Sequence, residues 1–102
     1  MPRGQATKGW REKAKALDRE TLAKEHPGCF LMLNEKKYPI CTQHGTVECA
    51  GIKSARRRAY INAFGTHRVL TRAQRQKHEQ VFHLASALDV KLCGGPKTYG
   101  GK

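Results

Sequence analysis

Large apolar side chains are scarce in this chain, and a long apolar run is missing altogether. Leu, Ile, Val and Phe together supply 18 of the 102 residues, a share below the roughly 20% under which highly charged chains tend toward disorder. No stretch of about 18 apolar residues occurs, so the sequence predicts no membrane span. A core this thin needs reinforcement by a metal, a disulfide or a partner surface.

An apolar leader segment is also missing from the N-terminal sequence MPRGQATKGW, so we expect no secretory signal. The protein is then expected to be made in a reducing compartment. Disulfides are uncommon there, and metal ligation competes with them for the four cysteines. The small core leaves little room for a catalytic cleft. A nucleophilic dyad of Cys41 and His44 is formally conceivable, but nothing nearby supplies an orienting acid or a phosphate-binding loop. We therefore predict a protein that is not an enzyme and has no catalytic residues.

Acidic residues are absent between Glu48 and Glu79, whereas residues 53–78 carry eight basic residues of a chain whose net charge is +12. Such a stretch is either a solvated basic face or a docking surface for nucleic acid or an acidic protein, and its length favours docking. Nucleic acid would be bound through its backbone and in a salt-sensitive way, because no aromatic RNA-binding set or GXXG clamp occurs. The predicted binding residues are Lys53, Arg56, Arg57, Arg58, Arg68, Arg72, Arg75 and Lys77.

Hydrophobic spacing predicts about three helices around a short β segment. The helices are expected over residues 10–25, 52–64 and 71–93, with very short strands inside a Cys-rich knuckle at 26–50. Thr71-Arg-Ala-Gln74 fits a capping box at the start of the last helix. The predicted fold class is mainly α with a small β-knuckle, in a single domain over residues 10–93. We expect residues 1–9 and 94–102 to be flexible arms that become ordered on a partner.

The predicted second helix carries an alanine-rich apolar stripe that would let another helix approach closely. Within it, Arg56 falls close to the stripe and should need a polar partner. Arg57 lies on the border of the stripe, and Arg58 projects away from it. The stripe consists of Ile52, Ala55, Ala59, Tyr60, Ala63 and Phe64.

The four cysteines, Cys29, Cys41, Cys49 and Cys93, leave three alternatives open. One structural zinc ion could be held by Cys29, Cys41 and Cys49 with either His26 or His44, although no CxxC pair occurs. The four cysteines could instead form two disulfides in any of three pairings. They could also pack as unlinked thiols, as small apolar side chains do.

The pattern CFLMLNEKKYPIC, followed by another Cys and by GIKSARRRAYINA, resembles a family of small Cys-rich proteins of large DNA viruses. The resemblance covers about residues 26–64 and, more loosely, 71–93. The sequence departs from the family's pattern at its start, where it has His26 and Cys29 instead of a CxxC. The matching residues are Cys29-Phe30-Leu31, Tyr38-Pro39-Ile40-Cys41, Cys49, Gly51, Ala55, Arg58 and Ala59, with Cys93 extending the match.

The resemblance implies a virion-associated structural protein, made in the host cytoplasm, rather than an enzyme. We expect a minor capsid or cement-type component that binds larger capsid subunits through its basic surface and extended termini. Large DNA viruses of this kind commonly encode thiol oxidases, so a disulfide would suit a particle assembled in the cytosol. The alternative is a zinc-stabilised nucleic-acid-binding protein with a genome-packaging or ribonucleoprotein role.

Overall fold

The computed structural model describes residues 9–65 and 69–94, so nearly all of both predicted arms, and Arg68, lie outside the described residues. The described chain is mainly helical with one small antiparallel sheet, which confirms the predicted fold class. In chain order the elements are α1 (Trp10–Ala16), α2 (Arg19–Glu25), η2 (Pro27–Cys29), β1 (Phe30–Met32), η3 (Leu33–Glu35), β2 (Lys37–Pro39), α3 (Cys49–Phe64) and α4 (Arg72–Cys93).

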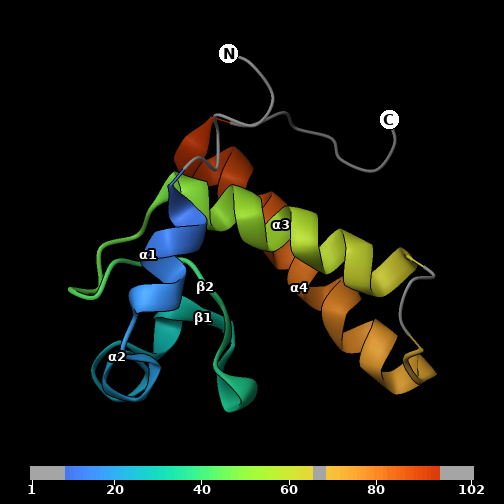
Figure 1. Ribbon diagram of the computed structural model, residues 1–102. Helices are drawn as coiled ribbons and strands as arrows, with labels where there is room; N and C mark the ends of the chain where they lie inside the picture. Colours follow the sequence, from blue (N-terminus) through green and yellow to red (C-terminus); the bar gives the residue numbers. More distant parts are fainter. Residues whose placement is uncertain (1–8, 66–68, 95–102) are drawn as a thin grey trace.

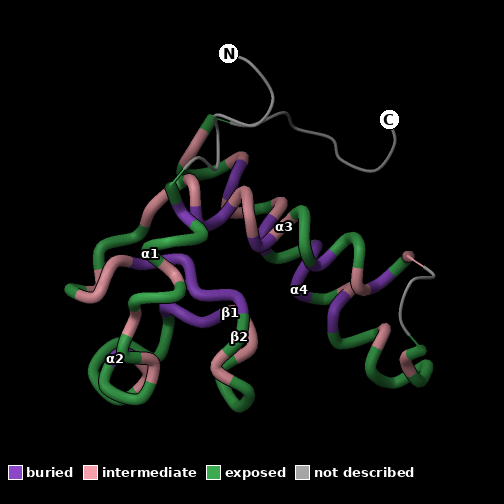
Figure 2. Tube along the Cα trace, viewed as in Figure 1, coloured by how far each residue is buried: buried purple, intermediate pink, exposed green. Residues whose placement is uncertain are grey.

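The helices α3 and α4 run side by side as an antiparallel hairpin, and the other elements pack against one side of it (Figure 1). Small side chains make this close pairing possible, because Ala55 and Ala59 of α3 and Ala85 of α4 are all buried. Their methyl groups leave little bulk between the two helix backbones. Figure 2 shows the buried residues concentrated along the inner faces of the two helices and in the two strands that pack against them.

Specific bonds join the two helices near both ends of the hairpin. The Cys49–Cys93 disulfide links the start of α3 to the end of α4. One turn further along, Lys53 lies 2.8 Å from the buried carboxylate of Asp89. At the opposite end, the Arg75 guanidinium donates to the carbonyl oxygens of residues 63 and 65, at 3.2 and 2.8 Å. These contacts fix the antiparallel orientation and the register of α3 and α4.

The apolar stripe predicted for α3 is buried only in part. Its aliphatic members face the core as expected, but Tyr60 and Phe64 remain 47% and 48% exposed. Both rings lie at the edge of the helix seam and rest on Phe82 of α4, with ring centroids 5.3 and 6.1 Å away. The prediction that they belong to the core is therefore wrong, because the contact with Phe82 leaves about half of each side chain exposed to solvent.

The Cys-rich knuckle is built on a single antiparallel strand pair. Phe30 of β1 pairs with Pro39 of β2, and an isolated bridge joins Cys41 to Val47. The Cys29–Cys41 disulfide closes this segment from within, and both of its sulfur-bearing residues are buried. Pro39 lies in a sheet of only two strands, so its lack of an N–H donor breaks no inner ladder.

The single helix predicted for residues 10–25 is two helices, because the chain is extended at Leu17 and Asp18. Asp18 caps α2 by accepting hydrogen bonds from the backbone N–H and the hydroxyl of Thr21. These bonds, the hydroxyl first, hold the pKa of Asp18 below its usual value. The Gln43 side chain binds the backbone N–H and carbonyl of the same residue, which fixes the break from outside. These two hydrogen bonds, here called the Gln43 clamp, are tertiary contacts that override the local helical pattern.

The capping box predicted for the last helix is confirmed. The Thr71 hydroxyl accepts from the Gln74 N–H at 3.1 Å, and the Gln74 side chain accepts from the Thr71 N–H at 2.8 Å. Gly94 then ends α4 in the left-handed conformation that glycine adopts without strain.

We predict that the double variant Cys49→Ser/Cys93→Ser loses about 4 kcal/mol of unfolding free energy, because the bond closes a loop of 44 residues. Denaturant unfolding of the oxidised proteins measures the loss. Cys49→Ala/Cys93→Ala is the control and should lose a similar amount, since the bond and not the new side chain matters. An unchanged midpoint in both variants would show that the α3–α4 pair is held without this bond.

Candidate nucleic-acid interface

The structure pairs all four cysteines as disulfides, Cys29 with Cys41 and Cys49 with Cys93. A sulfur in a disulfide carries no thiolate charge, so these residues cannot also serve as zinc ligands. No group of three or more His, Cys, Asp or Glu side chains that could hold a metal occurs within residues 9–65 and 69–94. The alternative of unlinked thiols and the zinc site of Cys29, Cys41, Cys49 and His26 or His44 are therefore not supported.

The same pairing removes the Cys41 thiol from the conceivable Cys41–His44 dyad, because a disulfide sulfur is not a nucleophilic thiolate. The two histidines proposed as metal ligands are both exposed. The His26 ring packs against Gly45, where an added Cβ would come within 2.8 Å of it. The ring thus has a packing role at the turn that the Cys41–Val47 bridge encloses.

The predicted basic binding set divides into residues with different roles. Lys53 is bound to Asp89 and Arg75 to two backbone carbonyls, so both hold the helical hairpin together. Lys77 lies 3.7 Å from Glu35 in an exposed ion pair. Arg56 is partly buried, as its position beside the apolar stripe predicted, whereas Arg72 is exposed at the first turn of α4. These residues do not form one surface.

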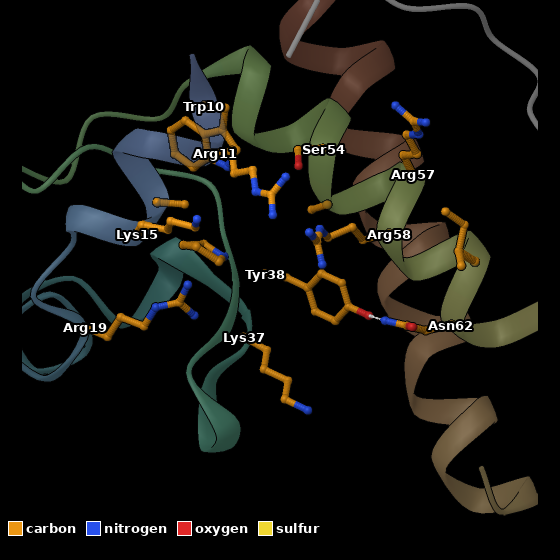
Figure 3. Close-up of a pocket in the computed structure, with 14 residues that line it drawn as sticks. Trp10, Arg11, Lys15, Arg19, Lys37, Tyr38, Ser54, Arg57, Arg58 and Asn62 are labelled. Atoms are coloured by element: carbon orange, nitrogen blue, oxygen red, sulfur yellow. Dashed lines mark hydrogen bonds between the residues drawn. The ribbon is translucent and has the colours of Figure 1, made fainter. Parts of the chain in front are cut away.

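Arg57 and Arg58 are exposed and lie on a groove of about 890 Å³ between α1, β2 and α3. Figure 3 shows Arg11 of α1 and Arg58 of α3 extending toward one another across this groove, while Arg57 points outward at its rim. The buried Tyr38 of β2 lies beside Arg58 at the floor of the groove, with its hydroxyl toward Asn62. Arg57 and Arg58, which belong to one basic run in the sequence, thus line the same groove as Arg11 from the first helix.

Four lining cations were missed by the sequence analysis, namely Arg11, Lys15, Arg19 and Lys37. With Arg57 and Arg58 they make six, and no Asp or Glu lines the groove. The first three belong to residues 1–28, which also contain four acidic residues. The net charge of that segment is therefore small and does not indicate a basic surface. One signal was available, because Arg11 and Lys15 are four residues apart and share a helix face.

The α1 wall of the groove is positioned by contacts on its inner side. The buried Trp10 ring packs on Gly51 of α3, where no side chain intervenes. Lys13 reaches Glu48 at 3.4 Å, just before α3 begins. The Gln43 clamp on Asp18 holds the other end of this helix. As a result, Arg11 and Lys15 remain on the outer face, toward the groove.

The floor of the groove rests on a buried polar cluster. The Tyr38 hydroxyl lies 2.6 Å from Nδ1 of His78 and accepts a hydrogen bond of 2.7 Å from the Asn62 side chain. Beside it, the Arg19 guanidinium donates to the Lys36 carbonyl at 2.6 Å, which fixes this cation at the lower edge. The cluster joins β2 to both α3 and α4, so the floor cannot shift independently of the helical hairpin.

Six cations without a nearby carboxylate create a strongly positive local potential. Arginine presents a planar set of N–H donors that matches the oxygens of a phosphate group, and lysine adds mobile point charges. The arrangement can therefore bind a chain of phosphates or carboxylates. Trp10 and Tyr38, which also line the groove, are buried and offer no free ring face.

Comparisons with known protein families, with curated proteins and with solved structures give no match to this chain. The resemblance to small Cys-rich viral proteins thus stays a prediction that rests on the matching residues. Within the described parts of the chain, none of the helices combines the length and the apolar character that crossing a lipid bilayer requires.

We predict that Gly51→Ala destabilises the fold by about 1–3 kcal/mol, because the new Cβ would lie 2.8 Å from the Trp10 ring and 2.9 Å from Cα of Ile40. The better helix propensity of Ala returns at most about 1 kcal/mol. Gly28→Ala is the control, since it has open space and should change little. Unfolding followed by the fluorescence of the single Trp measures both, and equal stability of the two variants would contradict the close α1–α3 contact.

We also predict that Tyr38→Phe costs about 1–3 kcal/mol, because it removes the hydroxyl between Asn62 and His78 in a buried site. Tyr60→Phe, which removes the hydroxyl of an exposed tyrosine, should change stability by less than about 0.5 kcal/mol. Thermal or denaturant unfolding of both variants provides the comparison. A Tyr38→Phe protein as stable as Tyr60→Phe would mean that the cluster does not hold the groove floor.

Proposed function

We propose that this chain is a non-enzymatic, disulfide-stabilised protein that binds nucleic acid through the phosphate backbone. The observation that carries the proposal is the groove between α1 and α3, which six cations line without a carboxylate. Its cations come from four elements, α1, α2, β2 and α3, spread over residues 11–58, so their gathering is a property of the fold. A solvated basic face would not require such convergence.

The geometry favours a nucleic acid over an acidic protein for two reasons. A phosphate backbone is a continuous line of negative charge, which suits cations placed along both walls of an open groove. The buried state of the lining aromatics also fits recognition of the backbone and not of the bases within this groove. Binding is then expected to be weakly dependent on sequence and strongly dependent on salt.

A structural role in a virion is the second candidate, and it rests on the resemblance to small Cys-rich proteins of large DNA viruses. Exposed apolar side chains outside the groove, such as Leu84 and Leu92 of α4, could contact larger capsid subunits. The two disulfides suit the oxidising assembly route that such viruses encode. A genome-packaging protein of a particle, made in the host cytoplasm, would combine both roles.

We predict that Arg11→Ala/Arg58→Ala weakens binding to mixed-sequence DNA and flattens its salt dependence. Each lost duplex phosphate contact should reduce the slope of log K against log salt by about 0.9. Fluorescence anisotropy over a salt series measures both quantities. Because these two side chains face one another across the groove, their removal takes one cation from each wall.

The matched control is Lys24→Ala/Lys91→Ala, which removes the same formal charge from two exposed positions outside the groove. This control should keep most of the affinity and the salt slope of the parent. Equal losses in the two double variants would indicate attraction by net charge alone. If the parent protein fails to bind DNA at physiological salt but binds an acidic capsid protein, the result would favour the structural virion role over nucleic-acid binding.

A further inference from the structure

One face of α3 carries a largely apolar stripe that the other described elements cover only in part. Tyr60, Ile61 and Phe64 are 47%, 39% and 48% exposed, and Arg57 precedes them at the spacing that completes the pattern i, i+3, i+4, i+7. Residues at that spacing share one face of a helix. This exposed stripe, Arg57–Tyr60–Ile61–Phe64, is distinct from the buried alanine face of α3 and begins at the edge of the seam with α4.

The exposed stripe is continuous with the cationic groove. Arg57 and Ile61 belong to both, because they also line the groove. A ligand that follows the groove and crosses its α3 rim therefore meets Tyr60 and Phe64 next. Both rings are already held in place, since they pack on one another at 5.0 Å between centroids and on the buried Phe82.

Charge decides what kind of ligand fits this face. The sixteen residues of α3 contain no Asp or Glu, and the net charge of the chain is +12. A second copy of the chain would bring another +12 against the same surface, which opposes association. A ligand that combines negative charge with flat apolar rings satisfies both the arginines and the aromatic side chains. Single-stranded nucleic acid has that combination.

We propose that the groove and the exposed stripe together form a binding site for single-stranded nucleic acid. The phosphates lie among the groove cations, and the bases that leave the groove across Arg57 stack on Tyr60 and Phe64. This inference rests on the proposed function and specifies its ligand. A duplex satisfies the groove cations but not the rings, because its bases are stacked inside the double helix and expose only their edges.

The test compares a short mixed-sequence DNA oligonucleotide as a single strand and annealed to its complement. In the variant Tyr60→Leu/Phe64→Leu, the leucine side chains still make apolar contacts with Phe82, but the flat aromatic faces are removed. We expect this variant to bind the single strand about tenfold or more weaker than the parent, with duplex affinity nearly unchanged. Circular dichroism and thermal unfolding establish that the variant is folded.

The matched control is Tyr60→Phe/Phe64→Tyr, which exchanges the hydroxyl but keeps both aromatic faces. It should bind the single strand with the affinity of the parent, so the contrast with the leucine variant isolates stacking. The expected spectroscopic signature of a stacked base is quenching of the tyrosine fluorescence by the single strand in the parent, and not in the leucine variant or by the duplex.

Equal effects of the leucine variant on single strand and duplex, or no effect on either, would overturn the inference. If Arg11→Ala/Arg58→Ala still weakened binding in that case, the proposed function would stand without it. Absence of binding to both DNA forms by the parent would remove the proposed function as well. A parent protein that sediments as a dimer and becomes monomeric in the leucine variant would assign the exposed stripe to self-association instead.

Discussion

The antiparallel pairing of α3 and α4 is the constraint on which the other elements depend. Alanines bring the two helix backbones close, and the pair is bonded near both ends, by Cys49–Cys93 and by Arg75. Between them lies Asp89, only 1% exposed, whose burial is compensated by Lys53 at 2.8 Å. Removing a partner from such a pair leaves a buried charge that costs several kcal/mol. The hairpin therefore uses two of the predicted binding cations internally and leaves others free to face outward.

Electrostatic repulsion among the cations of the groove destabilises the folded chain. Six cations that face one cavity without a carboxylate repel one another, and the net charge of +12 adds to this through the whole chain. Two disulfides restrict the unfolded chain and offset the repulsion and the small core. A bound polyanion would relieve the repulsion directly. Since it would bind the folded groove and not the dispersed cations of the unfolded chain, it would also stabilise the fold.

Local chemistry made parts of this structure predictable. The Thr71–Gln74 capping box and the alanine face of α3 depend on residues that are near in sequence, and both were predicted correctly. The break at Asp18 was not, because the Gln43 side chain that fixes it lies 25 residues away. The disulfide pairing and the groove likewise required the tertiary arrangement. Arg11 and Lys15 share a helix face, but only the packing of Trp10 on Gly51 places that face opposite Arg58.

The run Arg56-Arg57-Arg58 shows why a cluster of charge in a sequence is not yet a surface. Consecutive residues on an α-helix point about 100° apart, so three neighbouring arginines must face three directions. Arg56 is partly buried, Arg58 turns into the groove, and Arg57 stands on the rim between the groove and the exposed stripe. The helix thereby divides one basic run between a partly buried position, the groove and the rim of the groove. The proposed nucleic-acid site depends on that division and not on the number of charges.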